Sequence, residues 1–120
     1  NYLWNMISVR DSASKEKKEN FYHGMLLGLL RFREDWYIKS NAESGAGYSD
    51  ILIEIPQKRV GIVIEMKYAE QGRFDQACEV ALQQIREKRY EEKLIEDGMK
   101  RVLAYGIACY RKECEVKMEK

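Results

Sequence analysis

The stretch that decides the fold of this 120-residue chain spans Tyr48–Lys67 and reads YSDILIEIPQKRVGIVIEMK. Runs of Ile and Val favour β-strands, whereas proline and clustered polar residues favour a turn. The sequence therefore predicts a strand over Ser49–Ile55, a loop over Pro56–Arg59 and a second strand over Val60–Lys67, joined as a β-hairpin.

The position of the loop sets the register of this hairpin. If the loop is symmetric about Gln57 and Lys58, paired residue numbers sum to 115, and Asp50 then stands opposite Glu65. Side chains alternate between the two faces of a strand, so one face is wholly apolar and the other carries both carboxylates and Lys67. The apolar face comprises Ile51, Ile53, Ile55, Val60, Ile62, Ile64 and Met66; the other comprises Asp50, Leu52, Glu54, Gly61, Val63, Glu65 and Lys67.

Outward from the hairpin, the hydrophobic pattern predicts two amphipathic helices and three further strands. The helices cover Ser14–Arg33 and the segment from Gln71-Gly72 to about Glu96; the strands cover Trp36–Ser40, the central Val102–Cys109 and the edge Cys114–Met118, with a turn at Ser44–Gly47. A single α/β domain is expected from this order of helix, three strands, helix and two strands.

Composition narrows the classes of protein. Lys and Arg total 21 against 20 Asp and Glu, so the net charge of the chain does not indicate a polyanionic partner. No apolar run approaches the roughly 20 residues that cross a membrane, and a cytoplasmic protein without a membrane partner is expected. Cys78, Cys109 and Cys114 lack CxxC spacing, and the lone His23 cannot complete a zinc site with them. Reduced cysteines that serve packing are therefore expected.

Two acidic residues opposed on neighbouring strands have Cβ atoms about 5 Å apart, and their carboxylates repel each other. A divalent cation removes this repulsion, and hard oxygen ligands favour Mg²⁺ or Mn²⁺. Lys67 follows Glu65 on the same face, where its ammonium would orient a water or stabilise charge at phosphorus. These groups are the minimum equipment for metal-assisted hydrolysis of a phosphodiester.

The Glu-x-Lys pattern itself is common, since the chain contains four copies. Only the copy at Glu65 and Lys67 ends a β-run with a carboxylate in register across a hairpin, whereas Glu115 and Lys117 are expected on the outer face of an edge strand. The alternative interpretation of Glu65 and Lys67 is a surface salt bridge that contributes at most about 1 kcal/mol. Spacing alone leaves both interpretations open.

Ser49-Asp50-Ile51 and Ile64-Glu65-Met66-Lys67, in which Glu65 lies fifteen residues after Asp50, resemble the motif of the PD-(D/E)XK nuclease superfamily. The segments Glu19–His23, Glu43–Asp50 and Ala81–Tyr90 are similar to the bacterial and archaeal branch that lies C-terminal to an AAA-ATPase-like domain, and the resemblance covers roughly residues 15 to 118. It implies a restriction-endonuclease-like core, with a mixed central sheet flanked by helices. Residues 1–120 would form one such domain, the C-terminal part of a longer chain.

The resemblance also implies the roles of individual residues. The metal ligands would be Asp50, Glu65, the backbone carbonyl of Met66 and the first-helix acid Glu19; Lys67 would be the catalytic lysine, and Gln84 the glutamine that follows the core. Two departures from the branch are Tyr48, in place of an arginine, and Ser49, in place of the proline of the superfamily's name.

Several side chains keep two interpretations. His23 is either a partly buried helix residue bonded to Glu19 or a contact to substrate, and Tyr48 is a candidate substrate contact. Gln84 either makes helix-packing hydrogen bonds or belongs to the site. Lys88 and the arginines beside it are expected on a solvated helix face rather than at phosphates.

The resemblance implies a Mg²⁺- or Mn²⁺-dependent nuclease that hydrolyses nucleic acid, with DNA favoured, by in-line attack of a metal-activated water. The main alternative is a catalytically weak or inactive nuclease-fold module that binds nucleic acid or couples to an AAA-ATPase-like partner domain. A purely structural domain is the third hypothesis. The sequence leaves a homodimer open.

Overall fold

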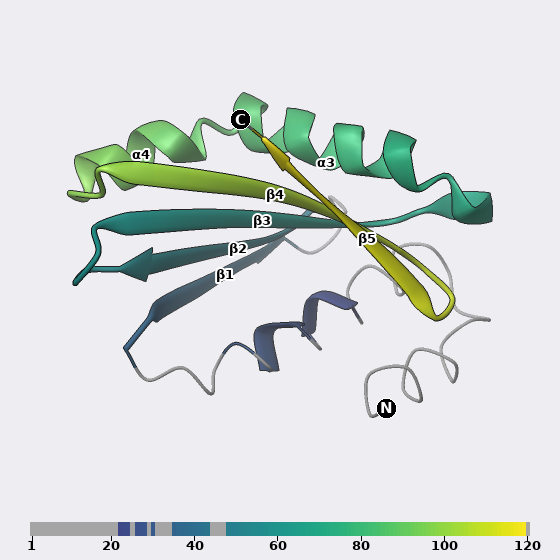
Figure 1. Cartoon of the computed structure of the whole chain (residues 1–120), viewed down its shortest axis with the longest axis horizontal. Coiled ribbons are helices and arrows are strands. Elements are labelled where there is room, and N and C mark those ends of the chain that lie inside the picture. The colour runs from purple at the N-terminus through teal and green to yellow at the C-terminus, as the bar shows by residue number, and fades with distance from the viewer. Residues whose placement is uncertain (1–21, 25, 29, 31–34, 44–47, 120) are drawn as a thin grey trace.

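The computed structural model describes residues 22–24, 26–28, 30, 35–43 and 48–119, which build a five-stranded sheet flanked by helices (Figure 1). The predicted α/β class with a mixed sheet is confirmed. Within this part of the chain no helix combines the length and the hydrophobicity that crossing a membrane requires. The strands are β1 (Tyr37–Glu43), β2 (Tyr48–Ile55), β3 (Val60–Tyr68), β4 (Arg101–Tyr110) and β5 (Glu113–Glu119); the 3-10 turn η1 (Glu70–Gly72) and the helices α3 (Phe74–Glu87) and α4 (Tyr90–Glu96) connect β3 to β4.

The strands lie in the sheet in chain order, β1-β2-β3-β4-β5. Only β3 and β4 are parallel, because the chain returns between them through α3 and α4. The hairpin of β2 and β3 has the predicted register, with Asp50 paired to Glu65 and Ile55 to Val60. The hydrophobic pattern and the loop length therefore placed the two carboxylates correctly.

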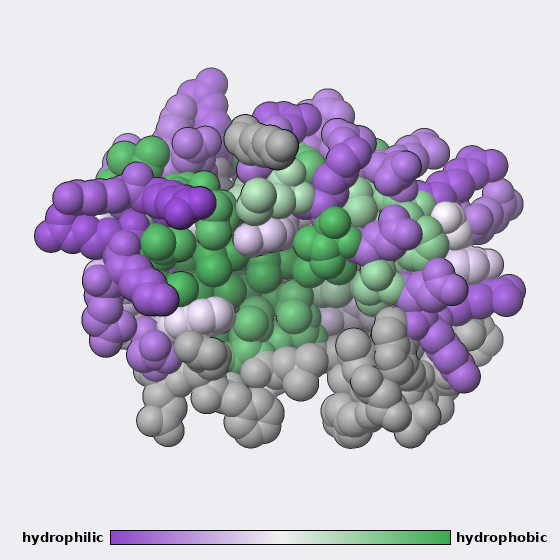
Figure 2. Space-filling view, viewed as in Figure 1, coloured by the Kyte–Doolittle hydropathy of each residue, from purple (hydrophilic) through white to green (hydrophobic). Residues whose placement is uncertain are grey.

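The two faces of the sheet pack against different helices. Ile51 and Ile53 lie in a core with Tyr22 of the first helical segment, whereas Leu52 and Val63 pack against the α3 and α4 layer. Asp50 and Glu65 alternate with the first pair and thus face α3 and α4. Figure 2 shows apolar residues gathered over the strands in the middle of one face, with hydrophilic residues at both ends of the molecule.

Helix α3 lies close to the sheet because both α3 and β4 have small residues at their contact. A Cβ placed on Gly106 of β4 would lie 2.6 Å from the carbonyl oxygen of Cys78 and 3.1 Å from Cβ of Ala81. No side chain fits in that space. The close approach fixes the height of α3 above the neighbouring Glu65, which pairs with Gly106.

The prediction of one continuous helix to Glu96 is wrong. Helix α3 ends at Glu87, and Arg89 adopts the left-handed conformation with φ 55° and ψ 38° before α4 begins at Tyr90. Neither glycine nor proline marks this break in the sequence, and a left-handed arginine costs roughly 1–2 kcal/mol. Tertiary contacts of the residues on either side of Arg89, described below, offset that cost.

The expectation that all cysteines are reduced is also wrong. Cys109 and Cys114 are direct partners across β4 and β5, with Cα atoms 4.1 Å apart, and they form a disulfide. The register of β4 and β5 brings the two sulfur atoms together. The spacing of the cysteines in the sequence did not reveal this pairing. Cys78 remains a free, buried thiol that contacts the carbonyl oxygen of Glu115, as the packing interpretation predicted.

Replacement of Gly106 by alanine tests the close approach of α3. We expect Gly106→Ala to lower the free energy of unfolding by about 1–3 kcal/mol, because the added methyl collides with backbone. Gly28→Ala is the matched control: Gly28 is exposed on a helix with open space around it, and alanine there should be neutral or stabilising by up to about 1 kcal/mol. Urea unfolding measures both, and equal effects would contradict the packing described.

Candidate active site

Two buried carboxylates form the centre of the candidate site. Asp50 on β2 is 1% exposed and Glu65 on β3 is 0% exposed, and the two residues are directly paired. Asp50 Oδ1 and both Oε atoms of Glu65 lack a hydrogen-bond partner among the described residues. Buried carboxylate oxygens without partners are costly, so this arrangement favours a bound cation.

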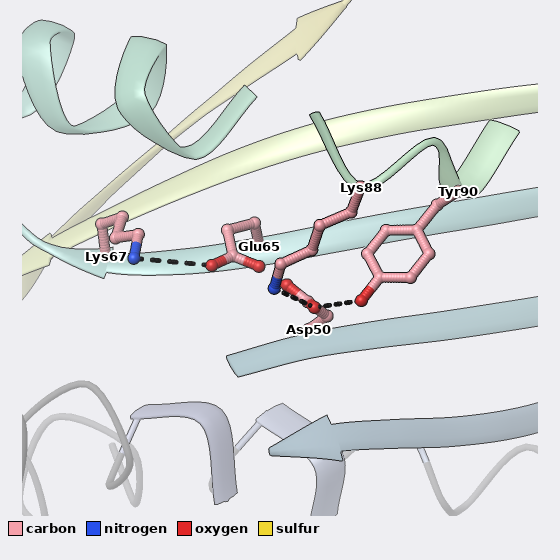
Figure 3. A network of polar contacts seen from close by, with 5 residues as sticks. All are labelled: Asp50, Glu65, Lys67, Lys88 and Tyr90. Carbon is pink, nitrogen blue, oxygen red and sulfur yellow. Dashed lines mark hydrogen bonds and ion pairs between the residues drawn. The ribbon is translucent and has the colours of Figure 1, made fainter. Parts of the chain in front are cut away.

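Lys67 lies beside Glu65 on the same face of β3. Its Nζ atom is 3.5 Å from Glu65 Oε1, which is close enough for an ion pair, while both oxygens of Glu65 remain without a hydrogen bond (Figure 3). The lysine side chain is only 10% exposed. The interpretation of Glu65 and Lys67 as a surface salt bridge is therefore wrong.

The residues on either side of Arg89 both contact Asp50. Lys88 Nζ lies 2.7 Å from Asp50 Oδ2, and Tyr90 Oη donates a hydrogen bond to the same oxygen at 2.5 Å (Figure 3). The break between α3 and α4 allows both side chains to reach one atom. The expectation that Lys88 lies on a solvated helix face is thus wrong, and the pattern gave no separate signal for Tyr90.

Gln84 lies one helical turn before Lys88 on α3. Its Oε1 atom is buried and has no hydrogen-bond partner among the residues described. Spacing of four residues puts Gln84 and Lys88 on the same side of the helix. The structure therefore leaves a buried amide acceptor on the side of α3 from which Lys88 reaches Asp50.

A pocket of 130 Å³ adjoins this side of α3 next to Lys67. Arg73, which immediately precedes α3, is exposed and lines it together with Lys67. Two cations thus line one hollow, together with the carboxylate of Glu70. The other lining residues are Tyr68, Gln76, Ala77 and Val80.

The remaining predicted site residues are not brought together in the described part of the chain. His23 is buried, and its Nε2 lies 2.5 Å from Oγ of Ser40, which pairs with Ile51 of the apolar face. His23 therefore lies across the sheet from Asp50. Met66 follows Glu65 on β3, and its side chain packs in the core that contains Ile51, on the opposite face of the sheet. Met66 can therefore contribute to the site only through its backbone. Glu19 and the side chain of Tyr48 lie outside the described residues.

The Glu115-x-Lys117 copy of the short pattern lies elsewhere. Lys117 Nζ is 2.5 Å from Glu79 Oε1, which joins the edge strand β5 to α3. The hydrogen bond and the charge of Lys117 lower the pKa of Glu79, and those of Glu79 raise the pKa of Lys117. The pair of Lys117 and Glu79 is thus an exposed ion pair between β5 and α3, separate from the pair of Asp50 and Glu65.

The described donors fit a hard divalent cation. Asp50 and Glu65 supply oxygen atoms that accept no hydrogen bond from the described residues, and Mg²⁺ is usually held by one or two carboxylates plus waters and substrate phosphates. No cluster of three or more His, Cys, Asp or Glu side chains occurs among the described residues. A softer metal that needs several nitrogen or sulfur ligands therefore finds no such set in that part of the chain.

Comparison with known proteins places the chain in a family. No curated protein and no solved structure gives a significant match. The family model of the PD-(D/E)XK nuclease superfamily matches residues 17–119, a range that includes both carboxylates and Lys67. Since this match covers most of the 120 residues and the sheet carries the paired acids and lysine on one face, the chain belongs to the PD-(D/E)XK nuclease superfamily.

Proposed function

We propose that this chain is a divalent-metal-dependent nuclease that hydrolyses phosphodiester bonds, with DNA as the favoured substrate. The observation that carries the proposal is the set of buried oxygens on Asp50 and Glu65 that have no hydrogen bond among the described residues, with Lys67 beside them. Membership of a nuclease superfamily supports the same chemistry.

Asp50 and Glu65 are the residues that would hold Mg²⁺ or Mn²⁺. By resemblance to the superfamily, the Met66 carbonyl and Glu19 would complete the ligand set. When bound, such a cation acts as a Lewis acid toward the phosphate and makes water a better nucleophile.

Lys67 would act on the reacting phosphate or on the water that attacks it. Its ammonium is nearly buried, and a charge in such a site interacts more strongly than it does in water. The amide of Gln84 would orient a water or a phosphate oxygen with its free acceptor and its NH₂ group. Arg73 would contact a neighbouring phosphate from the pocket beside Lys67.

A second candidate function is supported by the contact between Lys88 and Asp50. Because an ammonium already neutralises this carboxylate, a module that keeps the fold without cleaving nucleic acid is consistent with the same geometry. Such a module would bind nucleic acid or couple to an AAA-ATPase-like domain. Metal binding separates the two functions, because only the nuclease requires a cation at Asp50.

Mn²⁺ should stabilise the protein through the two carboxylates. At about 100 times the dissociation constant a bound ligand adds about 2.7 kcal/mol, which should raise Tm by about 10 °C in a domain of this size. We expect Asp50→Asn and Glu65→Gln to lose this shift and Glu54→Gln, on the same face of β2, to keep it. Thermal unfolding with and without Mn²⁺ measures the shift, and its absence from the wild-type protein would speak against the metal site.

Cleavage should depend on Lys67. We expect Lys67→Ala to lower kcat by about 10³-fold, the order of loss seen when a preorganised transition-state donor is removed. Lys58→Ala, in the exposed loop between β2 and β3, is the control that should keep full activity. Cleavage of labelled DNA in Mg²⁺ or Mn²⁺ measures both, and undiminished activity of Lys67→Ala would refute its catalytic role.

Arg73 should affect substrate binding more than chemistry. Loss of one exposed phosphate contact is worth about 1 kcal/mol, so Arg73→Ala should raise KM about fivefold with kcat nearly unchanged. Arg101→Ala, an exposed arginine at the start of β4, is the matched control. Steady-state kinetics on DNA measure the split. Unchanged kcat and KM would show that Arg73 does not contact substrate, and a fall in kcat at constant KM would place its contact in the transition state alone.

A further inference from the structure

Within the described part of the chain, two ammonium groups balance the charges of Asp50 and Glu65. The two carboxylates carry a formal charge of −2, and Lys67 at 3.5 Å from Glu65 and Lys88 at 2.7 Å from Asp50 carry +2. All four groups lie together near one end of the β2 and β3 hairpin (Figure 3). A divalent cation added to these four groups would bring their summed charge to +2 in a largely buried site, which disfavours metal binding unless further negative charge approaches.

Lys88 and Tyr90 share one oxygen of Asp50 but differ in charge. Both donate to Oδ2, and Oδ1 accepts no hydrogen bond from the described residues, so Asp50 is oriented for a ligand at Oδ1. The hydroxyl of Tyr90 is neutral, and its hydrogen bond would hold Asp50 in the orientation that binds such a ligand. The ammonium of Lys88 supports the orientation equally but repels a second cation.

We propose that Lys88 is a resident cation of the metal site, which weakens divalent-metal binding until an anionic nucleic-acid strand is present. This inference rests on the proposed function and describes how metal binding at its site is regulated. The phosphate of the strand supplies negative charge that offsets the cation. By linkage, each of the two ligands then raises the affinity for the other.

Lys88 lies at the edge of the site. Its side chain is 24% exposed and extends from the residue that directly follows α3, next to the left-handed Arg89. A lysine in this position can turn toward solvent or toward a phosphate without disturbing the core. Tyr90 begins α4 and keeps Asp50 in place when Lys88 leaves.

The test is a titration of the metal-free protein with Mn²⁺ in the absence of nucleic acid, with free Mn²⁺ followed by electron paramagnetic resonance. Lys88→Met keeps an unbranched side chain that is one atom shorter and removes its charge, and we expect it to raise Mn²⁺ affinity about tenfold. Lys88→Arg keeps the charge and should keep the wild-type affinity. Lys93→Met, an exposed lysine on α4, is the control for a general change in net charge.

The opposite sign would overturn the proposal. If Lys88 only orients Asp50, Lys88→Met should weaken Mn²⁺ binding about tenfold or more, as Tyr90→Phe is expected to do. Thermal unfolding of each metal-free variant verifies that it folds, and Lys88→Gln replaces Lys88→Met if the latter does not. Loss of binding in Asp50→Asn/Lys88→Met assigns the measured ion to this site.

The outcome also separates this inference from the proposed function. Wild-type protein that binds Mn²⁺ and cleaves DNA, together with weaker Mn²⁺ binding by Lys88→Met, removes the inference and leaves the nuclease. No Mn²⁺ binding by wild type or by Lys88→Met removes both. Tighter binding by Lys88→Met without DNA cleavage supports the resident cation and refutes the nuclease.

Discussion

The opposition of Asp50 and Glu65 across β2 and β3 is the constraint on which the rest of the site depends. Like charges at directly paired positions destabilise a sheet, and here both side chains are almost fully buried. Such a pair persists only with compensating positive charge. Lys67 and Lys88 supply it from two sides, and the carboxylate oxygens that accept no hydrogen bond from the described residues define the position at which a further cation would bind.

The packing of α3 determines which residues reach these carboxylates. Small residues at Gly106 and Ala81 let the helix lie close to β4, beside the strand that carries Glu65. The helix then ends where Lys88 can reach Asp50, and the left-handed Arg89 turns the chain so that Tyr90 reaches the same oxygen. A backbone conformation that costs energy is thus stabilised by contacts at the candidate site, a location where such strain is often found.

The two candidate functions differ in the cation that Asp50 holds. A nuclease needs a divalent ion there, whereas a module that only binds or couples is complete with Lys88. The superfamily match and the carboxylate oxygens without hydrogen bonds favour the first function, and the short contacts of Lys88 and Tyr90 show how the second would arise from the same fold. The charge that neutralises Asp50 therefore distinguishes the two candidate functions.

The sequence by itself determined the hairpin, its register and the face that carries Asp50, Glu65 and Lys67, because loop length and residue alternation are local properties. It also predicted the mixed order of strands and helices. Tertiary structure alone decided the break at Arg89, the disulfide of Cys109 and Cys114, and the contacts of Lys88 and Tyr90 with Asp50. The last two contacts join residues 38 and 40 positions apart, and no local pattern encodes how a helix end meets a strand once α3 has packed on the sheet.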